Sequence, residues 1–445
     1  MYEIVILGAG KSSSFLIEYL AKMASSFSYK LTVADANIQN LTARTTLLEN
    51  VQIVAASLED TSTLQKIISD ANIVISLLPP FLHTKVATLC LELKKHLLTA
   101  SYVSDEIQKM HDEAKSKNLL FLMECGLDPG LDHMSAMNIL DNLKEKGANI
   151  HSFRSFCGGR IAPESEDNPW GYKIIWNPRN VVLAGQGMSQ YMENGEIKYI
   201  PYPQLFKRAE ALFFENFGEY EAYPNRDSLS YIPKYKLENV DTFLRGTIRK
   251  RGFCSAWQCL VDLGLTDDSI KMMDISNFSI SEVFKRFFPT NVSIANYLKI
   301  GQDSEEYQKL LWLGCESDEK IALAGNVSPA EYLQVLLEKK WKLKDKDKDL
   351  VLMQHQILYE LDGKNHELHS SLSVLGQNAQ HTAMSKTVGL PLALAALFLY
   401  TGKITKRGVQ IPTEKEMYKP ILEECQTNQL LFIEEEKKQP SDDFY

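Results

Sequence analysis

The residues best suited to chemistry stand near the amino terminus, where an apolar β-branched run leads into a glycine loop. Residues 4–13 read IVILGAGKSS and residues 31–37 read LTVADAN. Gly-Ala-Gly after a strand lets the backbone turn tightly and approach a pyrophosphate, whose charge the free N–H groups of the next helix stabilise. Asp35 follows at about the spacing at which a carboxylate binds the ribose of a dinucleotide. The pattern predicts a nicotinamide or flavin dinucleotide site.

The loop departs from the G-x-G-x-x-G fingerprint at its third position, which is Ser13. Helix and strand must then pack around a small hydroxyl residue, and Ser12, Ser13 and Ser14 could cap the helix or bind a phosphate oxygen. A glycine loop alone would fit any tight turn between a strand and a helix. The strand before it, the amphipathic helix after it and the acidic residue favour the dinucleotide site.

Composition narrows the class of protein. The 445 residues leave room for two or three domains, and 44% apolar with 24% charged residues is ordinary for a soluble globular protein. A net charge of −9 argues against nucleic acid and against an anionic membrane as partners. The seven cysteines include no C-x-x-C pair, which favours reduced thiols over a disulfide framework or a metal site.

No signal peptide precedes the first expected strand, so we expect a cytoplasmic protein. The longest apolar run, 388–400, is too short to cross a bilayer and contains Pro391. We expect it to form a buried helix.

The elements that must position the glycine loop alternate along the first 125 residues. Strands are expected at 3–7, 30–34, 51–55, 72–78, 96–100 and 119–123. Helical stretches lie between most of them, so the pattern predicts an α/β fold with a doubly wound parallel sheet. Two prolines follow the fourth strand and end it at the carboxyl edge, where ligands bind in such sheets.

The pattern changes beyond residue 130. Asp132 is expected to cap a helix, and irregular β-like segments continue to about residue 250. A mostly helical stretch follows to about residue 340. Two alternating runs around Asp362-Gly363 predict a β-hairpin.

Five segments are more polar and richer in glycine than packing requires. They are TASYVSD (99–105), ECGLDPGLDHMSA (124–136), FCGGRIAPESEDNPWGYKIIW (156–176), YPNRDS (223–228) and RGTIRKRG (245–252). These segments resemble the glutamate-forming saccharopine dehydrogenases, also called saccharopine reductases. The resemblance extends over nearly the whole chain, through GAGKSSS, VISLLP, VLMQHQILYE and TVGLPLALAA. The string APES-x-DNP-x-GYK is far more specific than the glycine loop.

The resemblance implies a domain organisation. A Rossmann-like dinucleotide-binding domain is expected at 1–128, with a return of the chain at about 380–435. An α+β substrate and dimerisation domain is expected at 129–379, with a helical insertion at about 255–340. Residues 436–445 are expected to be a disordered tail. A homodimer is expected by the same resemblance.

The resemblance also implies a reaction, the reversible NAD(P)-dependent oxidation of saccharopine in lysine metabolism. Oxidation beside the secondary amine gives an imine, which water splits into L-glutamate and 2-aminoadipate 6-semialdehyde. The enzyme would be an oxidoreductase acting on a CH–NH group. Its substrate carries three carboxylates and two nitrogens, so the site needs several cationic and hydrogen-bonding groups.

Family resemblance implies the following site residues. Dinucleotide contacts are expected at Gly8, Ala9, Gly10, Lys11, Ser12, Ser13, Asp35, Ser57, Leu58, Leu78, Ala100, Ser101, Leu127 and Asp128. Substrate contacts are expected at Ser101, Tyr102, Asp128, Arg226, Thr247, Ile248 and Arg249.

The two arginines have alternative interpretations. Arg226 could be a surface residue paired with Asp227, and Arg249 could belong to a solvated basic turn with Lys250 and Arg251. A guanidinium fork on a substrate carboxylate is the better interpretation of both, given the family resemblance.

Candidates for proton transfer are few. Asp128 could simply form a turn, but a carboxylate at a strand end could also bind the substrate amine or move a proton, so it is the one catalytic candidate. His133 is interpreted as a satisfied helix histidine rather than a catalyst. Cys157 is expected to line the substrate cavity as a small polarizable wall.

Asp35 bears on the choice of cofactor, because a carboxylate there pairs with a free 2′-hydroxyl and repels a 2′-phosphate. The sequence therefore predicts NAD, with NADP the weaker alternative, and with NAD the lysine-degrading direction. Arg44, about two helix turns on, could weaken this prediction. Two other functions stay open: an enzyme of another amine–aldehyde pair, such as carboxynorspermidine synthase, and a non-catalytic NAD-binding scaffold.

Overall fold

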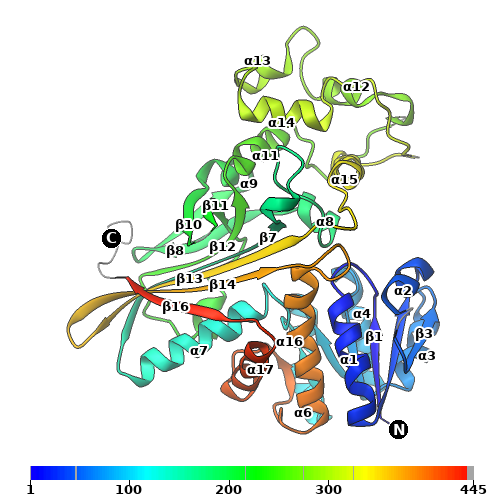
Figure 1. The fold of residues 1–445 in the computed structure, drawn as a ribbon, viewed down its shortest axis with the longest axis vertical. Helices are drawn as coiled ribbons and strands as arrows, with labels where there is room; N and C mark the ends of the chain where they lie inside the picture. The colour runs from blue at the N-terminus through cyan, green and yellow to red at the C-terminus, as the bar shows by residue number, and fades with distance from the viewer. Residues whose placement is uncertain (1, 46–47, 216, 274, 324, 438–445) are drawn as a thin grey trace. The chain divides into compact units, whose positions relative to one another are not determined.

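The computed structural model describes residues 2–45, 48–215, 217–273, 275–323 and 325–437 (Figure 1). The chain divides into two compact units. Unit 1 consists of Met1–Ala148 and Leu372–Ile433, and unit 2 of Asn149–Ser371 and Glu434–Tyr445.

Unit 1 contains a seven-stranded sheet in the order β15-β6-β5-β4-β1-β2-β3, in which every neighbouring pair is parallel. The strands are β1 (Tyr2–Leu7), β2 (Tyr29–Asp35), β3 (Val51–Ala55), β4 (Ile73–Ser76), β5 (His96–Thr99), β6 (Leu120–Leu122) and β15 (Gly408–Gln410). The predicted doubly wound parallel sheet is confirmed. Its central strands are unbroken apolar runs because helices cover both faces.

The helices of unit 1 follow the alternation that the sequence predicts. They are α1 (Ser14–Phe27), α2 (Ile38–Thr45), α3 (Thr61–Ser69), α4 (Pro80–Glu92), α5 (Asp105–Gln108), α6 (His111–Ser116), α7 (Leu131–Glu145), α16 (Ala383–Tyr400) and α17 (Lys415–Thr427). Helix α7 packs on α17, where the Tyr418 hydroxyl donates to Asp141 at 2.5 Å. Because of this packing α7 belongs to unit 1, whereas the sequence analysis began the substrate domain at residue 129.

Helix α16 is apolar on all sides and lies against α1 (Figure 1). It is long and apolar enough to cross a membrane, but 83% of it is buried inside the protein. It begins at Ala383, earlier than the apolar run at 388–400, and the predicted buried helix is confirmed.

Unit 2 is built on a nine-stranded sheet in the order β10-β11-β12-β7-β13-β14-β16, with β8 beside β12 and β9 beside β8. The strands are β7 (Asn149–Ile161), β8 (Met188–Glu193), β9 (Glu196–Pro201), β10 (Glu210–Phe214), β11 (Gly218–Pro224), β12 (Thr242–Lys250), β13 (Asp349–Leu361), β14 (Lys364–Leu375) and β16 (Phe432–Lys437). Asp362 and Gly363 both have positive φ, 53° and 71°, as a two-residue hairpin turn requires, and the predicted hairpin is confirmed.

At the chain's end the structure differs from the expected disordered tail at two residues. The expected disordered tail is wrong at Glu436 and Lys437, because both belong to β16 at the edge of the sheet. The rest of that tail, 438–445, lies outside the described residues.

The helices of unit 2 are mostly short. They are η1 (Pro163–Ser165), α8 (Pro178–Val182), α9 (Tyr202–Leu205), η2 (Phe206–Arg208), α10 (Tyr231–Lys234), α11 (Phe253–Asp262), η3 (Ile275–Asn277), α12 (Ile280–Phe284), η4 (Lys285–Phe287), α13 (Ile294–Leu298), α14 (Glu305–Leu313) and α15 (Pro329–Lys340). The run from α11 to α15 is mostly helical, as the sequence predicts up to about residue 340. Its aromatic core includes Trp170, Trp257 and Trp341, whose rings lie 5.5 to 6.3 Å apart.

We expect Gly389→Ala to destabilise unit 1. A Cβ on Gly389 would lie 2.7 Å from the backbone nitrogen of Leu16, so α1 and α16 would have to separate. Such overpacking costs about 2 kcal/mol, more than the roughly 1 kcal/mol by which alanine favours a helix over glycine. Urea unfolding followed by far-ultraviolet circular dichroism measures the change.

All five tryptophans lie in unit 2, so tryptophan fluorescence follows that unit separately. We expect the circular dichroism midpoint to fall to lower urea. Unchanged midpoints in both signals would contradict the close contact between the two helices.

Candidate active site

The residues expected to bind a dinucleotide all lie at the carboxyl edge of the parallel sheet in unit 1. Gly8, Ala9, Gly10, Lys11, Ser12 and Ser13 follow β1, Asp35 ends β2, Ser57 and Leu58 follow β3, Leu78 follows β4, Ala100 and Ser101 follow β5, and Leu127 and Asp128 follow β6. Parallel pairing brings these strand ends together, as the sequence analysis expected.

The glycine loop has the backbone that a phosphate cradle needs. Gly8 has a φ of +100°, and a Cβ there would lie 3.1 Å from the Leu77 carbonyl oxygen, so only glycine fits. A Cβ on Gly10 would meet no atom within 4 Å, which leaves open space beside the loop. The Ser14 Oγ at the start of α1 is buried and has no hydrogen-bond partner in the described part of the chain. These features fit a bound pyrophosphate.

Ser13 stands at the N-cap of α1 but does not cap it with its side chain. Its hydroxyl instead donates to the Gly10 carbonyl at 2.7 Å. The serine at the third fingerprint position therefore closes the loop on itself.

Asp35 uses both carboxylate oxygens to hold backbone in place. Oδ2 accepts the Ala9 N–H at 2.6 Å, and Oδ1 accepts the Asn37 N–H at 2.7 Å. The carboxylate thus ties the glycine loop to the end of β2. In α2, Arg44 is half-buried, and its Nε has no hydrogen-bond partner within the described residues.

His83, on α4, is a site residue that the sequence analysis missed. Its Nδ1 lies 3.1 Å from the Ser76 hydroxyl, and its Nε2 lies 2.7 Å from the Ser101 hydroxyl. The ring is buried, and burial lowers its pKa to about 4, so it is neutral at neutral pH. His83 therefore fixes the Ser101 side chain without adding charge. Its only sequence signal is its place just after the double proline that ends β4.

Tyr102 and Asp128 come from neighbouring strand ends and meet. The Tyr102 hydroxyl donates to Asp128 Oδ1 at 3.4 Å, and Tyr102 is 45% exposed. Asp132 is the second residue of α7 rather than its cap, and Oδ1 accepts the Gly130 N–H at 2.6 Å. His133 is fully buried and lies 2.9 Å from Glu124, in agreement with a satisfied helix histidine.

Arg249, on β12 of unit 2, is buried, so the solvated basic turn is wrong for this residue. Its guanidinium lies 5.4 to 5.6 Å from the ring centres of Tyr172, Tyr223 and Phe253. It donates to the Tyr223 hydroxyl at 3.0 Å and to the Ile248 carbonyl at 3.0 Å. Among the described residues, its Nε has no hydrogen-bond partner. Glu221, opposite Arg249 in register on β11, attracts the guanidinium without forming a hydrogen bond to it. The three rings, here called the aromatic box, surround a buried guanidinium whose Nε can still donate a hydrogen bond to an anion.

Thr247 lies on the same face of β12 as Arg249, because alternate residues of a strand share a face. Its hydroxyl donates to Asn225 at 2.7 Å, and in register it stands opposite Cys157 of β7. Cys157 is buried. Ile248 is directed to the other face and packs in the core, so of these three β12 positions only Thr247 and Arg249 share the face on which Cys157 lies.

Arg226 is exposed in the loop after β11. The expected alternative, an ion pair with Asp227, is not formed: Asp227 Oδ1 accepts the Gln190 amide at 3.2 Å and the Ser230 N–H at 3.1 Å. Within the described ranges the Arg226 guanidinium has no ion-pair partner, so it is available to an anionic ligand.

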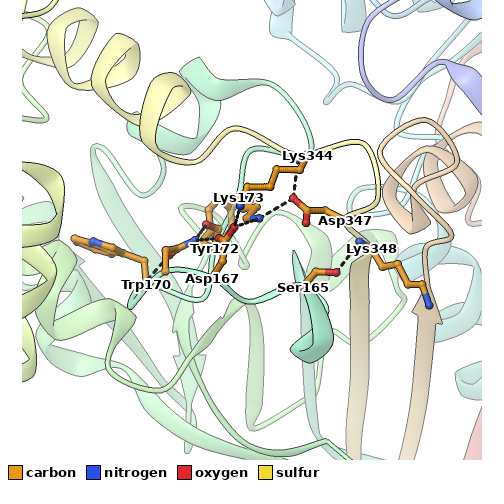
Figure 2. A network of polar contacts seen from close by, with 9 residues as sticks. Ser165, Asp167, Trp170, Tyr172, Lys173, Lys344, Asp347 and Lys348 are labelled. Carbon is orange, nitrogen blue, oxygen red and sulfur yellow. Dashed lines mark hydrogen bonds and ion pairs between the residues drawn. The ribbon is translucent and has the colours of Figure 1, made fainter.

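The specific string APES-x-DNP-x-GYK, at 162–173, forms a loop that ion pairs hold in place (Figure 2). Lys173, buried, lies 2.8 Å from Asp167 and 2.6 Å from Asp347. Lys344 adds a contact to Asp167 at 2.6 Å. The loop presents the Tyr172 ring to the Arg249 guanidinium, so this string is structural support for the aromatic box.

Comparisons with known families cover nearly the whole chain. The family profile "Saccharopine dehydrogenase NADP binding domain" matches residues 4–122, and "Saccharopine dehydrogenase C-terminal domain" matches residues 126–430. The Pyricularia oryzae saccharopine dehydrogenase [NADP(+), L-glutamate-forming] is 30% identical over 441 residues, which is 95% of this chain and 96% of the relative.

Longer relatives match only in part. The Arabidopsis thaliana alpha-aminoadipic semialdehyde synthase is 32% identical over 475 residues, or 97% of this chain but 44% of the relative. The chain therefore spans less than half of that protein.

Solved structures agree with the fold. The apo saccharopine dehydrogenase (L-Glu forming) from Saccharomyces cerevisiae has a TM-score of 0.86 and 29% sequence identity, covering 98% of this chain and 100% of that one. A homospermidine synthase from Legionella pneumophila, with a TM-score of 0.58 and 10% identity, shares the fold alone.

These matches contradict the predicted NAD. The matching profile is an NADP-binding domain, and the fungal relatives are named as NADP(+) enzymes. The prediction rested on Asp35 binding a ribose hydroxyl, whereas both of its oxygens accept backbone N–H groups. Spacing located the carboxylate correctly but did not reveal its partners.

We expect the buried neutral state of His83 to make unit 1 less stable in acid. Its pKa in the folded protein, about 4, lies below the ordinary 6.5, so its contribution is complete above pH 6.5 and is lost as the pH falls toward 4. Between pH 7 and pH 5 the loss from this one residue is about 2 kcal/mol.

Urea unfolding of the wild type and of His83→Gln at both pH values, followed by circular dichroism, measures this term. The variant should lose less stability on acidification than the wild type. Equal losses would contradict a depressed pKa. His96, whose pKa burial also lowers to about 4, provides a second test by His96→Gln.

Proposed function

The chain belongs to the saccharopine dehydrogenase family, and we propose that it catalyses the reversible oxidation of saccharopine to L-glutamate and 2-aminoadipate 6-semialdehyde with NADP+. The observation that carries this proposal is the Arg249 guanidinium, buried among three aromatic rings without an ion pair in the described residues. Burying a cation without an ion pair is costly, and its Nε has no hydrogen-bond partner among the described residues, which supports an anionic ligand. A substrate with three carboxylates supplies one.

The dinucleotide, when bound, supplies a hydride acceptor. For its binding we propose the loop from Gly8 to Ser13, because the open space beside Gly10 and the amino end of α1 suit a pyrophosphate. The other proposed contacts are Ser57, Leu58, Leu78, Ala100, Ser101, Leu127 and Asp128, which share the carboxyl edge of the sheet. Asp35 acts through the loop, because its carboxylate accepts the Ala9 N–H.

For saccharopine we propose residues in unit 2 and, separately, residues in unit 1. Arg226 and Arg249 bind carboxylates, and Thr247 and Cys157 line the same face of the sheet in unit 2. In unit 1, Ser101 and Tyr102 offer hydroxyl groups at the strand ends. Ile248 contributes its backbone carbonyl, which accepts from Arg249, rather than its core-packed side chain.

Asp128 is the residue that we propose for contact with the secondary amine of the substrate. Its carboxylate could accept the amine proton as the C–N bond becomes an imine, and the Tyr102 hydroxyl at 3.4 Å would orient it. Water then completes the hydrolysis of the imine. The lysine-degrading direction was predicted from NAD, so it loses its basis with that cofactor. A homodimer and a cytoplasmic location stay predictions.

The proposed activity is tested by mixing the purified protein with saccharopine and NADP+. We expect the near-ultraviolet band of reduced nicotinamide to grow with equimolar release of glutamate. A panel containing carboxynorspermidine separates this activity from that of another amine–aldehyde enzyme. A folded protein that binds NADPH but oxidises no substrate would contradict the proposal and favour a scaffold.

We expect Arg226→Ala to raise the KM for saccharopine by about 10- to 100-fold, because a charge-assisted contact contributes about 1.5 to 3 kcal/mol. The affinity for NADPH, measured by its fluorescence on binding, should stay unchanged. Arg251→Ala is the matched control, since Arg251 is 75% exposed at its side chain and pairs with Glu219 instead.

Arg249→Lys tests the aromatic box directly, because lysine keeps the charge but lacks the planar fork. Its KM for saccharopine should rise by about 10-fold or more.

If Arg226→Ala and Arg251→Ala have equal effects, Arg226 does not bind the substrate.

A further inference from the structure

Glu124 is an unusual residue for the inside of a sheet domain. It is the second residue after β6 and is 1% exposed, although carboxylates are rarely buried. Its φ of 55° lies in the left-handed region, where glycine or asparagine would cost less. Burial and backbone strain together disfavour glutamate here, so its contacts must compensate.

Two of these contacts are hydrogen bonds to the backbone of the loop that carries Tyr102. The Glu124 N–H donates to the Ser101 carbonyl at 3.0 Å, and Glu124 Oε1 accepts the Val103 N–H at 3.2 Å. The residues before and after Tyr102 are thus both bonded to Glu124. These two hydrogen bonds restrict the backbone dihedral angles of Tyr102.

The second carboxylate oxygen of Glu124 connects, through His133 and Asp132, to the loop that carries Asp128. Glu124 Oε2 lies 2.9 Å from Nε2 of His133 on α7, and Nδ1 of that ring lies 3.5 Å from Asp132. Asp132 in turn accepts the Gly130 N–H and donates its own N–H to the Leu127 carbonyl at 3.1 Å. Residues on both sides of Asp128-Pro129 are therefore attached to Asp132.

The network joins the backbones of two loops whose side chains also meet. Tyr102 and Asp128 are 3.4 Å apart, and the chain Glu124–His133–Asp132 fixes the backbone on either side of each. A metal ion does not explain the cluster, because no group of histidine, cysteine and acidic residues suited to a metal occurs in the described ranges. A purely apolar core would hold α7 in place without burying two carboxylates.

We propose that Glu124 and His133 are positioning residues of the reaction, which hold Tyr102 and Asp128 in the geometry that substrate oxidation needs. This inference rests on the proposed function and deepens it. Neither residue touches the substrate; each acts through the loop backbone. Their loss disturbs alignment of the reacting groups more than binding of the dinucleotide, whose phosphate loop lies at the end of β1.

Glu124→Gln tests the network with little change of shape. The amide replaces one carboxylate oxygen with an NH2 group, so either the Val103 N–H or the His133 ring faces a donor in place of a carboxylate oxygen. We expect kcat with saccharopine to fall by about 100-fold, the loss typical of small misplacements, while the Kd for NADPH changes by less than about twofold. His133→Gln should give a loss of similar size, and the double variant should lose little more than either single one, as members of one network do.

Glu3→Gln is the matched control in the same unit. Glu3 is a buried carboxylate at the opposite end of β1, where it accepts the Thr32 hydroxyl at 2.6 Å. Glu3→Gln should leave kcat at the wild-type value even where it lowers Tm. Equal losses of kcat in Glu124→Gln and Glu3→Gln would overturn the proposal, as would wild-type kcat in Glu124→Gln.

Hydrogen exchange separates this proposal from the proposed function. In Glu124→Gln, peptides covering 99–105 and 124–130 should exchange faster than in the wild type and in Glu3→Gln. If the wild type does not oxidise saccharopine, the proposed function is wrong. Hydrogen exchange in Glu124→Gln then still measures whether Glu124 holds the two loops. Unchanged exchange in Glu124→Gln overturns the network itself.

Discussion

Parallel strand pairing is the constraint on which the site in unit 1 depends. Seven strands run in one direction, so every loop that follows a strand lies at the same edge. The glycine loop, Asp35, Ser101 and Asp128 are distant in sequence and neighbours only for this reason. Hydrogen bonds then fix the conformation of these loops. Asp35 bonds to the glycine loop, His83 to the Ser101 hydroxyl, and Glu124 to the backbone next to Tyr102.

The sequence predicted the parts of the fold that periodicity and loop chemistry determine. Mainly apolar runs located six strands of unit 1, and Asp362-Gly363 located the hairpin of unit 2. Strands β15 and β16 were not foreseen, because three residues or a run of glutamates have no apolar pattern, and only their neighbours in the sheet make them strands.

Side-chain partnerships were harder to predict. The spacing of Asp35 located it at the strand end but could not show that backbone N–H groups engage both oxygens. His83 and Glu124 find their partners 18 and 21 residues away, across different loops, so no local motif indicates their roles. Arg249 was expected to bind a substrate by resemblance, but its aromatic box draws on Tyr172 and Phe253 from separate segments.

The return of the chain to unit 1 has a consequence for its synthesis. His111 contacts the carbonyl of Val409, 298 residues later, and β15 pairs with β6. While the ribosome makes unit 2, the β6 edge of the nascent sheet has no neighbour, and an open edge can pair with other chains. Closing so long a loop is slow but costs little more entropy than closing a shorter one. Unit 1 is thus completed only after nearly all of unit 2 has been made.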